Sequence, residues 1–89
     1  MAKYKKVPTI VDAILWNGSS ESDAQLGYML DSGRHYSRRS ESISDEYLVI
    51  HTPKGDMIAY HGDYIIRWPN GDVYPMKATE FENMYEPCD

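Results

Sequence analysis

The stretch "EYLVIHTPKGDMIAYHGDYIIRWPNGDVYPM", residues 46–76, decides the fold because it contains one pattern twice. Each half reads acid, tyrosine, two aliphatic residues, and later Pro-x-Gly-Asp followed by an aliphatic residue. Proline presets φ at the first central position of a type I turn, and the glycine that follows tolerates a positive φ. Such a turn closes a β-hairpin with a glycine bulge. The repeat therefore predicts two hairpins, joined at 61–63, that form a four-stranded antiparallel meander.

The segments before this repeat predict one more strand and a helix. Residues 8–18, "PTIVDAILWNG", are β-branched and apolar between Pro and Asn-Gly, which favours a strand. Both of its faces are largely apolar, so we expect it to lie in the middle of the sheet. Residues 19–33 favour a helix, because Ser and Asp caps open it, apolar residues recur at helical spacing and Gly33 stands at its C-terminal end. The polar residues 34–45 indicate a loop, with at most a short edge strand.

The C-terminal stretch "KATEFENMYE", residues 77–86, predicts a second short helix. Thr79 precedes Glu82 by three positions, which is the spacing of a capping box. Phe81, Met84 and Tyr85 then form one apolar stripe that can pack on the sheet. The whole chain, residues 1–89, is thus expected to be a single α+β domain. Its centre is an antiparallel β-meander of about five strands with two hairpins, packed with the two short helices.

The meander presents apolar side chains on both faces. One face would hold Tyr47, Val49, Tyr64, Ile66 and Trp68, and the other Leu48, Ile50 and Ile65. A lone antiparallel sheet usually leaves one face polar. Either the sheet curls into a partial barrel, or another copy of the chain buries the spare face. We favour the second alternative, a homo-oligomer (dimer or tetramer), because symmetric self-association commonly buries such a face.

The composition excludes several classes of partner. The 89 residues hold 9 Lys or Arg against 14 Asp or Glu, a net charge of −5. A general nucleic-acid binder needs a broad basic face, so no nucleic acid polymer is expected, although a local basic pocket could still hold a small anion. No apolar run reaches the length of a membrane span, and the N-terminus does not resemble a signal peptide, so no membrane partner is expected. The single cysteine, Cys88, excludes an intrachain disulfide and fits a reducing cytoplasm.

No pattern of catalytic residues appears. His35, His51 and His61 have no carboxylate at ligand-like spacing, and one cysteine cannot complete a zinc cluster, so no metal and no cofactor are expected. The chain has no glycine-rich phosphate loop and no nucleophile elbow. Asp63 and Asp72 could be paired carboxylates for acid–base chemistry, but each follows a glycine in a turn, where Asp bonds its own backbone. We therefore interpret the protein as one that is not an enzyme.

Two segments, "KYKKVPTIVDAILWNG" (3–18) and "GDYIIRWPNGDVYPMKATEFENMYE" (62–86), resemble a group of small phage and prophage proteins. The pattern of that group begins K-Y-x-K-x-P and V-x-A-x-x-W-x-G. It ends P-G-D-Y-I-I, a Gly-containing turn, Y-P-C-K and F-x-x-x-Y-E. This chain departs from it with His61 for Pro, Trp68 for Gly and Met76 for Cys, and the last change argues against thiol chemistry there. The resemblance implies a phage origin and a location in the host cytoplasm.

Small phage proteins of this size often act by binding, and the chain looks similar in type to tetrameric phage sponges that trap cyclic-dinucleotide immune signals (anti-CBASS sponges). The expected function is to bind and sequester a cyclic nucleotide, such as cyclic GMP-AMP, without cleaving it. A site for this small anionic ligand needs cations for the phosphates and flat rings for the bases. The candidate ligand-binding residues are Trp16, Arg34, Tyr36, Arg38, Arg39, Tyr60, Arg67, Trp68 and Lys77.

Two other functions stay open at this point. The chain could inhibit a host protein by direct binding through an aromatic patch or its acidic C-terminal half, or it could be a virion accessory protein without a ligand. The pair Arg38–Arg39 separates the three, since only a sponge must lose ligand binding when both are replaced. Trp68, which stands beside only one of the two similar turns, is either an interface anchor or a platform for base stacking.

Overall fold

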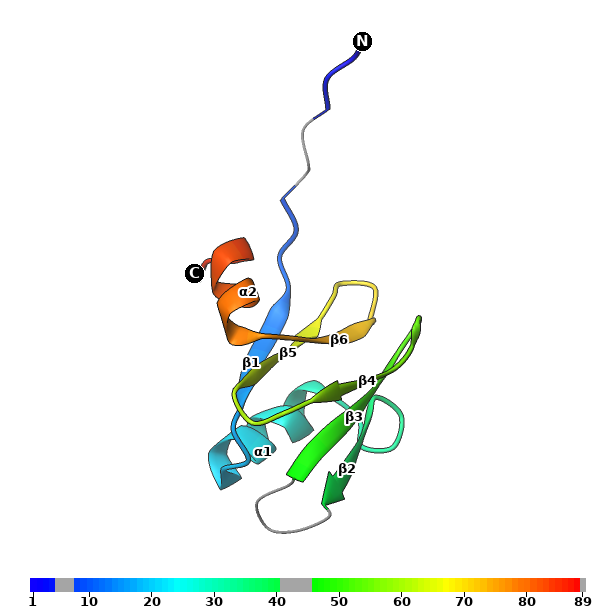
Figure 1. Ribbon diagram of the computed structural model, residues 1–89, viewed down its shortest axis with the longest axis vertical. Coiled ribbons are helices and arrows are strands. Elements are labelled where there is room, and N and C mark those ends of the chain that lie inside the picture. Colours follow the sequence, from blue (N-terminus) through cyan, green and yellow to red (C-terminus); the bar gives the residue numbers. More distant parts are fainter. Residues whose placement is uncertain (5–7, 41–45, 89) are drawn as a thin grey trace.

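The computed structural model describes residues 1–4, 8–40 and 46–88. These residues form two three-stranded antiparallel sheets and two helices, so the predicted α+β class is confirmed (Figure 1). Sheet A has the strand order β1-β5-β6, and sheet B has the order β2-β3-β4. The bounds are β1 Asp12–Trp16, α1 Ser20–Met29, β2 Tyr36–Ser40, β3 Glu46–Thr52, β4 Gly55–Ala59, β5 Asp63–Arg67, β6 Val73–Met76 and α2 Ala78–Met84.

Both predicted hairpins are confirmed. Strands β3 and β4 pair up to the register Thr52↔Gly55, and β5 and β6 pair up to Arg67↔Val73. In the second hairpin the N–H of Gly71 donates to the carbonyl of Trp68 at 2.9 Å, which is the closing bond of a β-turn. Gly55 and Gly71 have φ values of 110° and 93°, the positive range that the repeated turn chemistry predicts for the glycine.

The expected four-stranded meander is wrong, because the chain changes sheets between β4 and β5. A tight turn from Tyr60 to Asp63 makes this change: the Asp63 N–H donates to the Tyr60 carbonyl at 3.0 Å, and Gly62 has a φ of 96°. Positive φ at the third position is the requirement of a type II turn. Strand β5 then pairs with β1 on one side and β6 on the other.

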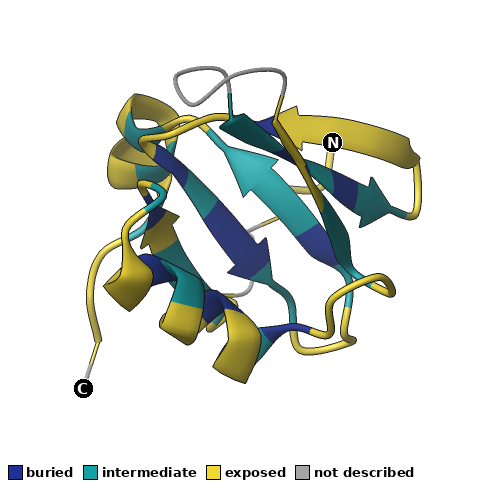
Figure 2. Cartoon of the chain, turned by 90° about the horizontal axis from the view of Figure 1, so that it is seen from below, coloured by how far each residue is buried: buried dark blue, intermediate teal, exposed yellow. Residues whose placement is uncertain are grey.

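This crossing lets the two sheets cover each other's inner faces. Leu48 and Ile50 of β3 join Ile65 of β5 and Val73 of β6 in one buried core, together with Trp16 of β1. Leu48, Ile50 and Ile65 are therefore buried within one chain. The second copy of the chain that we expected to cover an apolar face is not needed for these three residues. Figure 2 shows the buried positions gathered along the strands between the helices, while most of β4 is exposed.

Helix α1 covers one end of this core. Ser19 caps it, since its hydroxyl accepts the N–H of Ser22 at 3.1 Å. The sequence predicted that the helix would end near Gly33, but it ends at Met29. The reason is Leu30, which leaves the helix in an extended conformation and buries its side chain in the core.

Three local expectations are also corrected. Strand β1 lies at the edge of sheet A and is shorter than residues 8–18, because only its Trp16 face is buried while Leu15 is 42% exposed. Part of the polar segment 34–45 forms β2, the edge strand that was left open, and residues 41–45 lie outside the described residues. Helix α2 begins after Lys77, which has no side-chain cap; Thr79 lies inside the helix, so the capping box is absent. β6 ends at Met76, and the chain turns directly into this helix.

Within the residues that the structure describes, neither helix has the length and apolar composition that a membrane span requires.

Candidate ligand site on sheet B

A line of cationic and aromatic side chains runs over the outer face of sheet B and ends at Lys77, which stands between β6 of sheet A and helix α2. Arg39 of β2 lies opposite Tyr47 of β3 in the strand register. The ring of Tyr47 is 6.3 Å from the ring of Tyr60, centroid to centroid. The Lys77 Nζ lies 5.1 Å from the centroid of the Tyr60 ring, a cation–π contact. We call Arg39, Tyr47, Tyr60 and Lys77 the aromatic row.

Strand alternation explains why these side chains face outward. Successive residues of a strand point to opposite faces of its sheet. Leu48 and Ile50 are fully buried in the core, so Tyr47 and Val49 belong to the outer face of β3. Val49 lies opposite Ile58 of β4, which is 47% exposed, so a second, apolar line runs beside the aromatic row.

The members of the aromatic row differ in how firmly they are held. Arg39 is exposed and makes no ion pair with another described residue, so its guanidinium is free to meet an anion. Tyr60 is half exposed. Lys77 is positioned by Asp63, whose carboxylate oxygen Oδ2 lies 3.2 Å from Nζ. Asp63 is only 5% exposed and also accepts the Tyr60 N–H at 2.9 Å, so one buried carboxylate places both a ring and a cation.

Arg38, the neighbour of Arg39, is engaged in a different arrangement on the inner side. Its Nη1 donates to Asp23 of α1 at 2.8 Å, and its Nε donates to Glu46 of β3 at 2.9 Å. The other Glu46 oxygen lies 3.1 Å from His61 Nε2, and Trp16 Nε1 donates to Asp23 at 3.1 Å. The Trp16 and His61 rings meet edge to face at 4.8 Å. We call these five residues the Arg38 network.

The network lowers the pKa values of its two carboxylates and raises the pKa of Arg38. Partial burial raises the pKa of Asp23, but hydrogen bonds from Arg38 and Trp16 outweigh it, and the pKa lies below its ordinary value. The hydrogen bond from His61, followed by that from Arg38, lowers the pKa of Glu46. The hydrogen bond to Asp23 raises the pKa of Arg38. The two carboxylates that contact Arg38, those of Asp23 and Glu46, are thus ionised at neutral pH. They occupy the Arg38 guanidinium on two sides.

The carboxylate neighbours of the histidines were not foreseen. The residue spacing predicted no carboxylate partner for His51 or His61. In space, Asp56 lies 2.9 Å from His51 Nδ1, and Glu46 contacts His61. Residue spacing along the chain does not reveal partners that the fold alone brings together. In the described part of the chain, no three His, Cys, Asp or Glu side chains cluster in a way that could hold a metal ion.

The structure divides the nine predicted ligand-binding residues into three sets. Arg39, Tyr60 and Lys77 come together in the aromatic row, whose fourth member, Tyr47, was not among the predicted residues. Trp16, Arg38 and Arg67 hold the fold together: Trp16 is fully buried and cannot stack on a ligand, and Arg67 donates to the Met29 carbonyl at 2.7 Å and to Asp12 at 2.6 Å. The remaining three, Arg34, Tyr36 and Trp68, lie elsewhere.

Arg34, Tyr36 and Trp68 belong neither to the aromatic row nor to the ion pairs and hydrogen bonds formed by Trp16, Arg38 and Arg67. Arg34 is largely exposed and lies 3.9 Å from Asp31, a long ion pair that holds it loosely. Tyr36 packs against the core. Trp68 belongs to the outer face of sheet A, where it borders two hollows.

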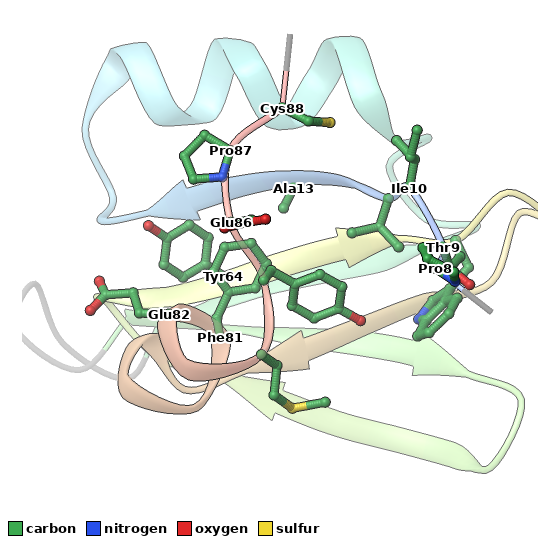
Figure 3. Close-up of a pocket in the computed structure, with 14 residues that line it drawn as sticks. Pro8, Thr9, Ile10, Ala13, Tyr64, Phe81, Glu82, Glu86, Pro87 and Cys88 are labelled. Atoms are coloured by element: carbon green, nitrogen blue, oxygen red, sulfur yellow. The ribbon is translucent and has the colours of Figure 1, made fainter. Parts of the chain in front are cut away.

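The larger hollow on sheet A differs chemically from the aromatic row. This cavity of about 880 Å³, which we call the α2 groove, lies between residues 8–11, the outer face of β5, helix α2 and the C-terminal segment (Figure 3). Its walls include Tyr64, Trp68 and Phe81, and its charged residues are Glu82 and Glu86. None of the described residues that line it is a lysine or an arginine. An anionic ligand is therefore disfavoured in the α2 groove and favoured at the aromatic row.

The signal for the aromatic row was present in the sequence but required the strand register. Tyr47 belongs to the acid-Tyr start of the first hairpin, and Arg39 follows Arg38 in the polar segment. Only the pairing of β2 with β3 brings Arg39 and Tyr47 together. No protein-family model, no curated protein and no solved structure matches the chain.

Proposed function

We propose that this protein binds a cyclic nucleotide second messenger at the aromatic row and sequesters it without cleaving it. The observation that supports this is the order cation, ring, ring, cation, from Arg39 on the outer face of sheet B to Lys77 at the start of α2. Tyr47 and Tyr60 offer flat faces to bases, and Arg39 and Lys77 offer charged donors to phosphates. A cyclic dinucleotide contains two bases and two phosphates, which is the same set of complementary groups.

The surroundings of the row favour binding over hydrolysis. The carboxylate in contact with the row is Asp63, and it is buried and occupied by Lys77 and the Tyr60 N–H. A general base must be within reach of the water or hydroxyl that it activates. The described residues of the row, an arginine, a lysine and two tyrosines, suit recognition of charge and of ring planes.

Energetics favour an assembly of several copies. Two stacked bases contribute about 1–3 kcal/mol each, and two charged hydrogen bonds about 1.5–3 kcal/mol each, so one row supplies about 5–12 kcal/mol. Association costs at least about 4 kcal/mol, which leaves a single open row with modest affinity. Two rows that face one ligand across a two-fold axis would roughly double the contacts. We therefore propose a homo-oligomer that acts in the host cytoplasm, in line with the phage resemblance.

Native mass spectrometry of the purified protein tests the proposal. The protein is measured alone and then with a panel of cyclic dinucleotides and cyclic ADP-ribose isomers. A sponge gains ligand masses in whole multiples, and heating the complex releases the same, intact ligand. Release of a linear or hydrolysed nucleotide contradicts sequestration, and absence of any mass gain at micromolar concentration contradicts the proposal.

Calorimetry with the ligand that binds then tests the site. Arg39→Ala should weaken binding about 10- to 150-fold, as expected for a lost charged hydrogen bond. Tyr60→Leu should weaken it about 5- to 150-fold through lost stacking. Arg34→Ala is the matched control, because Arg34 is exposed and lies outside the row. Equal effects of Arg34→Ala and Arg39→Ala would place the ligand elsewhere.

A second function is favoured by one specific feature, the exposed apolar side chains of β4. Ile58 is 47% exposed and shares the outer face of sheet B with Val49 and the half-exposed Tyr60, whereas Met57, 43% exposed, points to the opposite face. Such a surface suits direct inhibition of a host protein. The test is to immobilise the chain and ask whether it recovers one host protein in a stoichiometric amount. Recovery that is lost in an Ile58→Asp variant would support this alternative, provided that no nucleotide binds.

A further inference from the structure

The N-terminal end of the chain projects away from the body of the molecule (Figure 1). The molecule measures 54 Å along its longest axis and 27 and 22 Å along the others. Tyr4 is 94% exposed, and Met1 and Ile10 are also exposed. We call residues 1–4 the N-terminal arm. Exposed large apolar side chains on an extended arm are typical of a segment that packs against another molecule.

The α2 groove has the complementary chemistry. Its aromatic wall is rigid, because Phe81 stacks on Tyr64 at 4.0 Å and on Tyr85 at 5.0 Å. Figure 3 shows the Tyr64 and Phe81 side chains together, with Glu82 at one side and Glu86 above them. The side chains of the arm, in contrast, carry one charge, that of Lys3. A positively charged segment with an aromatic residue therefore matches an aromatic groove with two carboxylates.

We propose that the α2 groove binds the N-terminal arm of a second copy of this chain, in a reciprocal exchange. Tyr4 of one copy packs on Tyr64 and Phe81 of the other, and Lys3 pairs with Glu82 or Glu86. The geometry favours exchange because Pro8 to Val11, from which the arm departs, form one wall of the groove. A two-fold axis beside this wall places each arm over the partner's groove.

Reach and area are sufficient for this arrangement. The seven residues before Pro8 span at most about 24 Å when extended, at about 3.3–3.6 Å per residue. A tyrosine buries about 150–250 Å². Counted on both contacting surfaces and in both directions, the two tyrosines bury about 600–1,000 Å², close to the lower bound of specific interfaces. Met1 and Lys3 supply the remainder.

Arm exchange rests on the homo-oligomer of the proposed function, but it does not depend on the nucleotide ligand. The α2 groove lies on sheet A, and none of its lining residues is Arg39, Tyr47, Tyr60 or Lys77, the members of the aromatic row. Loss of arm exchange and loss of nucleotide binding are therefore separate outcomes. Crosslinking reports the first, and ligand mass gain reports the second.

Site-directed crosslinking tests the exchange, because Cys88 lines the groove and is the only cysteine of the sequence. One chain carries Tyr4→Cys with Cys88→Ser, and the other chain is native and differs only by a purification tag. After mixing and mild oxidation with copper-phenanthroline, arm exchange gives a disulfide-linked heterodimer. The control chain carries Lys54→Cys with Cys88→Ser, since Lys54 is exposed at the tip of the β3–β4 turn.

We expect at least a tenfold higher heterodimer yield from the Tyr4→Cys chain than from the Lys54→Cys chain. Equal yields, or a native chain that sediments as a monomer at about 100 µM, would overturn the proposal. A charge reversal adds an independent readout of the dimer dissociation constant. Lys3→Glu and Glu86→Lys should each weaken the dimer about 2- to 30-fold over the two pairs, and the double variant should recover it. The same cycle is measured with Glu82→Lys, and if neither double variant is tighter than its single variants, the model of exchange is contradicted.

Discussion

Replacing Arg38 by methionine removes the guanidinium that joins Asp23 of α1 to Glu46 of β3, while it keeps an unbranched apolar side chain. Arg38 is 42% exposed, so each ion pair is screened by solvent and is worth about 0.2–1 kcal/mol. Glu46 and Asp23 are only 19% and 30% exposed, and leaving them partly unpaired costs about 1 kcal/mol more. The free energy of unfolding should therefore fall by about 1–3 kcal/mol.

The neighbouring arginine is the matched control. Arg39 is exposed and makes no ion pair with another described residue, so Arg39→Met should change the free energy of unfolding by less than about 0.5 kcal/mol. Urea unfolding at neutral pH, followed by tryptophan fluorescence, measures both. The Tm of the Arg38 variant should fall by about 8–16 °C for a loss of 2 kcal/mol in a domain of this size. Equal stability of the two variants would refute the structural role of the Arg38 network.

Three further predictions follow from local geometry. Gly18→Ala should destabilise the fold by about 1–3 kcal/mol, because Gly18 has a φ of 79° and an added Cβ would lie 2.5 Å from His61 Nε2. Gly27→Ala is the control, since open space surrounds Gly27. A similar loss of Tm in both variants would contradict the prediction. The folded-state pKa of Glu46 is lowered from 4.5, so its stabilisation is present above that pH and is lost as the pH falls through the folded pKa. Glu46→Gln should therefore flatten the fall in stability below about pH 5, as urea titrations at several pH values will show, and an unchanged acid limb would disprove it. Phe81→Ala should release α2, which has no buried residue and no side-chain cap; hydrogen exchange in α2 should rise at least tenfold while the Tm falls by only a few degrees, about the effect of local opening.

The parts of the fold that could be predicted are those set by neighbours in the chain. Gly55 and Gly71 take the positive φ that their turns require, and both hairpins form as expected. The choice of partner for β5 is different, because its side chains Ile65 and Ile66 are apolar on both faces whether β5 pairs with β4 or with β1. That choice depends on which arrangement buries Leu48 and Ile50, and this is a property of the whole chain.

The candidate site shows the same division. Arg38 and Arg39 look like one cationic pair in the sequence, but adjacent residues of a strand face opposite sides of a sheet. Once residues 36–40 form β2, Arg38 points to Asp23 and Glu46, and Arg39 lies beside Tyr47. The polar composition of this segment indicated a loop, so neither direction could be assigned. Recognising β2 as a strand would have separated the two arginines.

The same rule explains why Trp68 accompanies only one of the two turns. Arg67, the residue before it, faces the inner side and is held by Asp12 and the Met29 carbonyl, so it cannot share a ligand with Trp68. Trp68 borders the α2 groove and a smaller hollow of about 350 Å³ beside Ile66. The groove has carboxylates and, among its described residues, no cation to hold a phosphate. Trp68 is therefore better placed to anchor a protein contact than to stack on a nucleotide base. Trp68→Ala should weaken self-association and leave nucleotide affinity unchanged, and the reverse result, measured by sedimentation and calorimetry, would reassign it to the ligand.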